Sequence, residues 1–229
     1  MASTYPSLSP VHRILLWSEF TLLCVVVPLL FVYVIPTRVL FGVLWVLAAY
    51  GFFILWKYHG QTLRGIWNQA AVTKENLRPI LTRFIIASVV IGASVAYFEP
   101  ARLFSFPRQR TELWAMVMVL YPLLSVIPQE LVFRPFFFAR YQRLFQRPWL
   151  LVAASAITFG FAHILFQNWI SVVLCMAGGL MFAITYQRTR SLALVWLEHA
   201  LYGCFIFTIG LGYFFYHGSV QTVQVEAGS

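Results

Sequence analysis

The sequence contains no aspartate, and acidic residues of any kind are scarce. Its 229 residues include seven glutamates, and charged residues make up only 10% of the chain. A soluble domain carries about 25% charged and about 45–50% apolar residues, whereas 61% of this chain is apolar and its mean hydropathy is +0.79. These proportions exclude an ordinary soluble globule, and the high hydropathy excludes a disordered chain.

Cysteine is also rare, and basic residues do not cluster. The three cysteines are Cys24, Cys175 and Cys204, which lie far apart inside apolar runs, so a disulfide-stapled secreted domain is excluded. The formal net charge is +9, but the lysines and arginines are dispersed between apolar stretches. Because nucleic-acid binding requires a basic patch or run, we expect no nucleic-acid partner.

Long apolar runs are what the sequence does contain. A membrane-spanning helix needs about 20 apolar residues, so the composition predicts about seven spans, with six to eight as the range. We therefore expect an all-α, polytopic membrane helix bundle in which residues 11–229 form a single membrane domain after a disordered tail, 1–10. The expected spans are residues 11–35, 39–56, 80–98, 112–138, 149–166, 169–186 and 191–209.

Two segments qualify this pattern. The polar stretch 57–79 cannot cross lipid, and we expect it to lie along the membrane surface as a short interfacial helix. The fourth span contains Pro122, Pro128 and Pro135. Because a proline inside a helix removes a hydrogen bond, we expect this helix to be kinked or broken near Pro128.

The distribution of lysine and arginine predicts the orientation, because short cytoplasmic loops are enriched in them. A cytoplasmic amino terminus places eleven of these residues inside and four outside, and leaves Arg134 within the membrane. We therefore expect a multi-pass protein of the cell (inner) membrane, with its amino terminus in the cytoplasm and membrane lipids as its surroundings.

Five ionisable residues fall inside the expected spans of the carboxyl-terminal half. A charged side chain near the bilayer centre costs about 2.5–3.5 kcal/mol, so such residues are functional-site candidates. At about 1.5 Å per residue, Glu130, His163 and His199 lie roughly 15, 21 and 12 Å inward from the cytoplasmic ends of their helices. The five residues are Glu130, Arg134, His163, Glu198 and His199.

A carboxylate and two imidazoles in one layer of the membrane allow three kinds of chemistry. They could hydrolyse an amide by moving protons and stabilising an oxyanion. They could hold zinc through Glu130, His163 and His199, or they could relay protons in a transporter. Glu198 lies about 100° around the helix from His199, so we expect it to pair with Arg134 or with a neighbouring helix.

Three segments resemble the ordered motifs of the CAAX protease and bacteriocin-processing family of integral membrane proteases, also called CPBP or ABI. They are QELVFR (129–134), FGFAH (159–163) and EHALYG (198–203). The family signature is Glu-Glu-x-x-x-Arg, then Phe-x-x-x-His, then His-x-x-x-Asn or similar. The resemblance covers residues of about 112–210, which it identifies as a CAAX-protease-like core.

This resemblance implies an intramembrane endopeptidase that needs no metal or other cofactor. In the family, a glutamate and the first histidine activate water, and the last motif stabilises the oxyanion. Carried over by position, Glu130 with His163 would form the base, His199 would hold the oxyanion, and Arg134 would orient Glu130. Phe159 matches the phenylalanine of the second motif.

Two positions depart from the signature. Gln129 stands where the first glutamate would be, and Gly203 stands where the asparagine would be. Glutamine cannot act as a base, and glycine offers no side-chain donor. Glu130 could turn inward as the base, and Tyr202 or a backbone N–H near Gly203 could supply the missing donor.

The expected function is hydrolysis of a peptide bond in a membrane-associated peptide or protein. The alternative is a catalytically inactive family member that acts as a membrane peptide-binding, immunity or regulatory protein. A proton-coupled transporter is disfavoured because the sequence has no inverted repeat.

Overall fold

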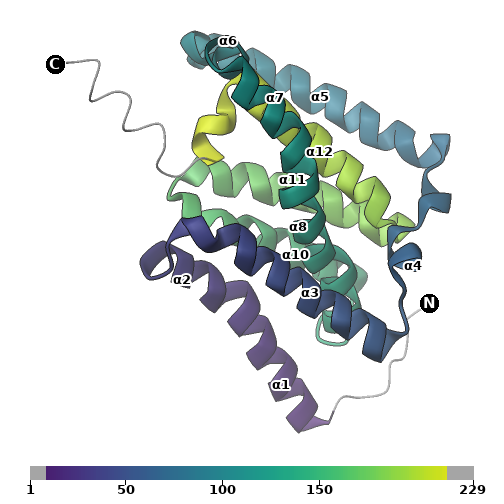
Figure 1. The fold of residues 1–229 in the computed structure, drawn as a ribbon. Coiled ribbons are helices and arrows are strands. Elements are labelled where there is room, and N and C mark those ends of the chain that lie inside the picture. The colour runs from purple at the N-terminus through teal and green to yellow at the C-terminus, as the bar shows by residue number, and fades with distance from the viewer. Residues whose placement is uncertain (1–8, 216–229) are drawn as a thin grey trace.

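The computed structural model describes residues 9–215, and every regular element in that range is helical (Figure 1). Seven of its helices are long and apolar enough to cross a membrane, which confirms the predicted helix bundle. The expected tail lies largely outside the described residues, and the first helix begins at Pro10. The seven spans are Pro10–Tyr33, Thr37–His59, Lys74–Phe98, Thr111–Tyr141, Pro148–Phe166, Trp169–Thr189 and Leu192–Ile209.

The spans are assembled from shorter helical elements. The first four spans contain α1 (Pro10–Thr21), α2 (Val27–Tyr33), α3 (Leu40–His59), α5 (Lys74–Phe98), α7 (Thr111–Leu120), α8 (Ile127–Leu131) and α9 (Phe137–Tyr141). The last three spans contain α10 (Pro148–Ala162), α11 (Trp169–Thr189) and α12 (Leu192–Ile209). Two short helices, α4 (Leu63–Trp67) and α6 (Ser105–Gln109), lie in the connections between spans.

The polar stretch 57–79 contains a short helix, but much of the stretch belongs to other elements. Helix α3 ends at His59, where Gly60 adopts a left-handed conformation, and the five-residue α4 and a 3₁₀ turn, Gln69–Ala71, follow. Helix α5 already begins at Lys74, because the Thr73 hydroxyl accepts a hydrogen bond from the Asn76 backbone N–H and caps the helix. Such a cap satisfies amides that the helix itself leaves free, so α5 starts earlier than hydropathy predicts.

The fourth span is also more continuous than predicted, because it does not break at Pro128. Helices α7, α8 and α9 follow one another through two wider, π-helical turns, Tyr121–Val126 and Val132–Phe136. Pro122 and Pro135 lie inside these turns, whereas Pro128 falls in the first turn of α8. A π turn inserts an extra residue and is often found at functional sites, so it changes which side chains face the bundle interior.

Helix α12 lies inside the bundle and α5 lies at its margin, far from α1 (Figure 1). The closest helix pair is α10 with α11, and small residues make this approach possible. Gly179 faces the Ala156 carbonyl and the Phe159 side chain, as expected for a small residue in a helix contact. Gly160 on α10 faces the backbone of Met176. Both glycines therefore help to bring α10 and α11 together beside the site.

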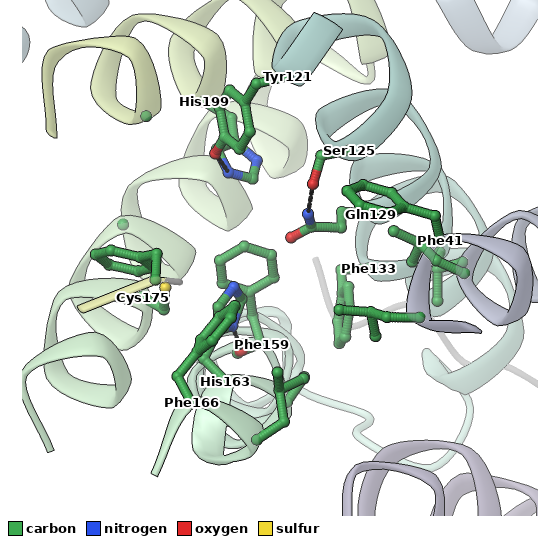
Figure 2. Close-up of a pocket in the computed structure, with 18 of the residues that line it drawn as sticks. Phe41, Tyr121, Ser125, Gln129, Phe133, Phe159, His163, Phe166, Cys175 and His199 are labelled. Carbon is green, nitrogen blue, oxygen red and sulfur yellow. Dashed lines mark hydrogen bonds between the residues drawn. The ribbon is translucent and has the colours of Figure 1, made fainter. Parts of the chain in front are cut away.

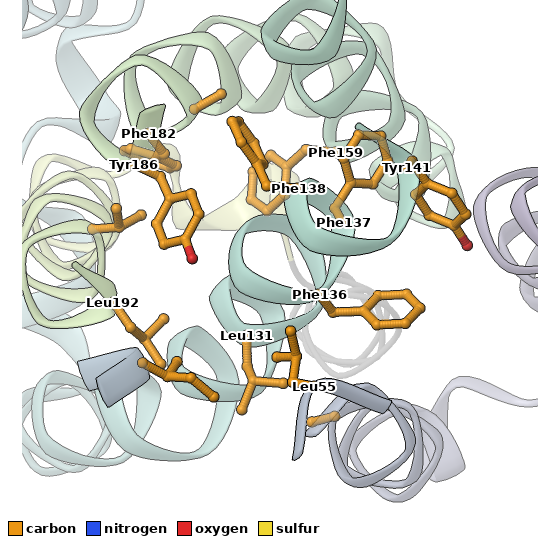
Figure 3. Close-up of a cluster of buried hydrophobic side chains, with 14 of the residues drawn as sticks. Leu55, Leu131, Phe136, Phe137, Phe138, Tyr141, Phe159, Phe182, Tyr186 and Leu192 are labelled. Atoms are coloured by element: carbon orange, nitrogen blue, oxygen red, sulfur yellow. The ribbon is translucent and has the colours of Figure 1, made fainter. Parts of the chain in front are cut away.

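Aromatic side chains dominate the buried core beneath the site (Figure 3). The cluster combines residues of α8, α9 and the π turn between them, Val132–Phe136, with residues of α3, α10, α11 and α12. Its aromatic members are Phe136, Phe137, Phe138, Tyr141, Phe159, Phe182, Tyr186 and Tyr202. This packed layer fixes the fourth span against the last three, and so fixes the relative positions of the three sequence motifs.

Candidate active site

Glu130 on α8 is completely buried and is held by two partners. Its Oε1 lies 2.7 Å from His199 Nδ1, and its Oε2 lies 3.0 Å from Arg134 Nε. A carboxylate can only accept hydrogen bonds, so His199 donates from Nδ1. The predicted proximity of Arg134 to Glu130 is therefore present, and both carboxylate oxygens face charged or polar groups.

Arg134 is equally buried, and several contacts compensate its charge. Its Nη1 donates to the Ser155 hydroxyl at 2.6 Å and to the Phe133 carbonyl at 3.1 Å. The guanidinium carbon also lies 5.1 Å from the ring centroid of Phe159 and 5.8 Å from that of Phe182. Aromatic faces attract cations, so the two rings and Glu130 together offset the cost of burying this charge.

His199 on α12 connects Glu130 to a phenol hydroxyl. Its Nε2 lies 2.9 Å from the hydroxyl oxygen of Tyr121, which belongs to the first π turn of the fourth span. With Nδ1–H donated to Glu130, Nε2 of the neutral ring accepts from Tyr121. The ring also stacks on Phe182, with centroids 4.7 Å apart. The result is a carboxylate–imidazole–hydroxyl chain, the same order of groups as in a serine hydrolase triad.

His163 occupies a different position from the one expected beside Glu130. It ends α10, and its Nδ1 lies 2.7 Å from the Phe159 carbonyl oxygen. Because a carbonyl only accepts, Nδ1 carries the hydrogen and Nε2 of the neutral ring remains an acceptor. Within residues 9–215 no hydrogen bond joins His163 to Glu130, since the Phe159 ring lies 4.8 Å from His163 and 5.5 Å from His199.

A cavity of about 820 Å³ is lined by Tyr121, His163 and His199. Figure 2 shows Tyr121 and His199 on one side, His163 on the other, and the Phe159 ring between them. Gln129 projects from a further side and donates from Nε2 to the Ser125 hydroxyl at 2.7 Å (Figure 2). Gln129 lines the cavity, whereas its neighbour Glu130 is turned away from it, toward His199 and Arg134.

Much of the cavity wall comes from the first two spans. The residues that form this apolar wall include Leu23, Val27, Phe31, Phe41, Leu44 and Leu47. The cavity therefore has a small polar end, built by motif residues together with Tyr121 and Ser125, and a long, mostly hydrocarbon wall from the amino-terminal segments, which also contribute Thr37 and Arg38.

Glu198 lies outside this constellation. Its Oε1 pairs with Arg83 Nη2 at 2.9 Å, and its Oε2 accepts from the Thr185 hydroxyl at 2.5 Å. The partners thus come from α5 and α11 and do not include Arg134. Of the two partners that the sequence left open for Glu198, the neighbouring helix is the one found.

The expected substitutes for the missing asparagine are not directed at His199. The Tyr202 hydroxyl lies 3.4 Å from Met181 Sδ, away from the imidazole. At Gly203, a Cβ atom would collide with the Tyr121 ring. Tyr121 therefore fills the space beside Gly203, and its hydroxyl lies 2.9 Å from His199 Nε2.

Sequence reasoning missed Tyr121 and Ser155. Neither belongs to a motif, and a tyrosine or serine within an apolar run is unremarkable by composition. The available signal was Gly203 itself, because a glycine at a position that normally carries a side chain leaves space for a large residue of another helix.

The alternative zinc site is not supported by the arrangement of the side chains. In the part of the chain that the structure describes, no three His, Cys, Asp or Glu side chains are grouped so that they could hold a metal ion. Glu130 and His199 face each other, and Tyr121 takes the second nitrogen of His199. We therefore derive no step through a metal.

Comparison with known proteins gives a family match for one segment of the chain. A family model described as type II CAAX prenyl endopeptidase Rce1-like matches residues 110–205. No curated protein and no solved structure matches the chain. The matched segment contains all three motifs and the complete polar end of the cavity. The chain is therefore a multi-pass membrane protein in which residues 110–205 match the Rce1-like CAAX protease family.

Proposed function

We propose that this protein is an intramembrane endopeptidase that hydrolyses a peptide bond of a membrane-associated peptide or protein. One observation carries the proposal. His163 lines the same largely apolar cavity as His199 and Tyr121, and Glu130 holds His199 from outside the cavity. A base and a hydrogen-bonded polar group on opposite sides of one void are what amide hydrolysis requires.

The proposed base is His163 rather than Glu130. His163 Nε2 takes a proton from water, the resulting hydroxide attacks the substrate carbonyl carbon, and the same nitrogen returns the proton to the leaving amine. The Phe159 carbonyl holds the ring in the required tautomer. Gln129 offers its amide oxygen to the attacking water, since its Nε2 is already donated to Ser125. Glu130 and Arg134 act indirectly, by orienting His199.

The cavity indicates the class of substrate. Ligand sites of about 300–1,000 Å³ enclose molecules of drug size, and a cavity of about 820 Å³ falls in this range. Its apolar wall from the first two spans favours a hydrophobic peptide segment or a peptide that carries a hydrocarbon chain. A polar peptide would leave its own hydrogen-bonding groups unsatisfied against this wall.

A second function is favoured by the position of Gln129. The residue that faces the cavity at the first motif cannot act as a base, and the adjacent carboxylate faces away from the cavity. A protein with this arrangement could bind the same peptides without cleaving them. It would then serve as a membrane peptide-binding, immunity or regulatory protein.

The two functions are separated by proteoliposome cleavage assays on the wild type, His163→Ala and Gln129→Glu, with a library of lipidated and unmodified hydrophobic peptides. We expect the wild type to cleave and His163→Ala to lose at least about 10²-fold in kcat, as general acid–base catalysis contributes 10²–10⁴-fold. The control is His59→Ala, because His59 is exposed at the end of α3.

The outcomes discriminate clearly. A wild type that binds but cleaves nothing, together with a Gln129→Glu variant that cleaves, supports the second function. A His163→Ala variant that cleaves as fast as an active wild type contradicts the role given to His163.

A further inference from the structure

We propose that Tyr121 is a catalytic residue, whose hydroxyl donates a hydrogen bond to the oxyanion that forms during peptide hydrolysis. This inference rests on the proposed endopeptidase function and names a donor that lies outside all three motifs. Three observations carry it: Gly203 leaves space for the Tyr121 ring, both ring nitrogens of His199 are engaged in hydrogen bonds, and the Tyr121 phenol is held at the cavity wall.

The first observation is steric. Gly203 lies one helical turn after His199 on α12, where a side chain would point at the fourth span. A Cβ atom there would collide with Cε1, Cζ and the hydroxyl of Tyr121. The glycine and the tyrosine are therefore complementary in volume. The polar group that the third motif lacks has a counterpart in the phenol, which enters the same space from another helix.

The second observation is that both nitrogens of His199 are engaged. Nδ1 donates to Glu130 at 2.7 Å, and Nε2 lies 2.9 Å from the Tyr121 oxygen. A neutral His199 in this tautomer has no N–H left for a substrate. The Tyr121 hydroxyl beside it lines the cavity and carries a hydrogen that it can donate.

The third observation is that Tyr121 is held in place. It begins the π turn Tyr121–Val126, and its ring contacts Phe207 edge-on with centroids 5.2 Å apart. The carbonyl of the next residue, Pro122, accepts a hydrogen bond from Trp196 Nε1 at 2.8 Å. Tyr121 lines the cavity together with His163 (Figure 2). The hydroxyl is thus fixed in position while its hydrogen can still rotate.

These positions give the donor its selectivity for the transition state. Before reaction, the hydroxyl donates to His199 Nε2. When hydroxide adds to the substrate carbonyl, rotation about the phenol C–O bond redirects the same hydrogen to the developing oxyanion. A charged acceptor forms a stronger hydrogen bond than a neutral one, so the bond forms chiefly in the transition state and accelerates the reaction. Tyr121 transfers no proton in this step.

The test compares wild type with Tyr121→Phe, which keeps the ring and its packing but removes the hydroxyl. Loss of one oxyanion donor lowers kcat by about 10²–10³-fold, and we expect this loss with KM nearly unchanged. In a parallel binding assay, Tyr121→Phe should bind a phosphinic peptide, a charged mimic of the tetrahedral intermediate, on the order of 10²-fold more weakly. Binding of the matched amide peptide should be unchanged.

The matched control is Tyr186→Phe. Tyr186 is a buried tyrosine of α11 that does not line the cavity, so its kcat and phosphinate affinity should equal those of the wild type. A wild type that cleaves and a Tyr121→Phe variant with the same kcat overturn the role of Tyr121. A wild type that neither cleaves nor prefers the phosphinate overturns the endopeptidase function itself.

A reciprocal variant tests the steric basis. Gly203→Asn should be destabilised, because its side chain collides with the Tyr121 ring. The double variant Tyr121→Ala, Gly203→Asn should recover stability and part of the activity, because the amide then supplies a donor in the vacated space. A single Gly203→Asn variant that is as stable as the wild type contradicts the complementarity of the two residues.

Discussion

Gln129 and Glu130 are adjacent in the chain, but their side chains face different surroundings. Neighbouring residues of a helix differ by about 100° in direction, so only one of the two can face the cavity, and that one is Gln129. Glu130 instead completes a buried cluster with Arg134 and His199. Its carboxylate therefore serves first to balance charge inside the bundle.

This role predicts a large cost for neutralising Glu130. Glu130→Gln leaves Arg134 buried without its counter-charge, and breaking a buried pair in this way costs about 3–5 kcal/mol. Titration of the purified protein with SDS in mixed micelles should show that lower stability. The control is Glu99→Gln, because Glu99 pairs with Arg102 at the surface, and such pairs contribute no more than about 1 kcal/mol. Equal losses in the two variants would contradict the buried pairing.

The candidate site was only partly predictable at the residue scale. The motifs single out His163 and His199, because charged and polar groups within spans are costly and rarely incidental, and the structure places both in the wall of one cavity. The structure does not bring the side chains of Glu130 and His163 together, because their directions depend on the π turn before α8 and on the Phe159 ring. Neither feature has a signature in the sequence.

At the scale of elements, long apolar runs were sufficient to predict all seven spans. Their length and composition are set by the thickness of the membrane. The proline-rich fourth span does not break near Pro128, because wider turns at 121–126 and 132–136 accommodate Pro122 and Pro135 without interrupting the helix. Proline position alone does not distinguish a break from a π turn.

The contact between α10 and α11 predicts a specific sensitivity at Gly160. A Cβ atom there would lie 2.7 Å from Met176 Cβ and 3.0 Å from its Cα, so Gly160→Ala must separate the helices. Overpacking of this kind costs about 1–3 kcal/mol, and the melting temperature in detergent should fall accordingly. The control is Gly42→Ala, because Gly42 on α3 has nothing within 4 Å. A Gly160→Ala protein with the stability of that control would contradict the close packing.

At the scale of the whole molecule, the cavity joins two parts of different origin. The polar end lies within the segment that matches the family model, while much of the hydrocarbon wall comes from residues 23–47, outside that match. Arg140 and Glu19 hold the parts together through hydrogen bonds of 2.9 and 2.7 Å. The sequence could not predict this wall, because apolar residues of a span carry no signal that distinguishes a lipid-facing side from a cavity-facing side.

The placement of the charges predicts an orientation for the whole molecule. Because the single span Lys74–Phe98 separates them, the connections at Arg64 in α4 and at Arg108 in α6 lie on opposite sides of the membrane. The excess of arginine and lysine on one set of connections predicts that Arg64 is cytoplasmic and Arg108 external.

Arg64→Cys and Arg108→Cys should therefore differ in their reaction with a membrane-impermeant maleimide. In intact cells only Arg108→Cys should be labelled, whereas both should react after lysis, because both positions are exposed. The native cysteines all lie within spans, and the unsubstituted protein measures their background. Labelling of Arg64→Cys in intact cells, with Arg108→Cys protected, would reverse the orientation and place the His163 end of α10 on the cytoplasmic side.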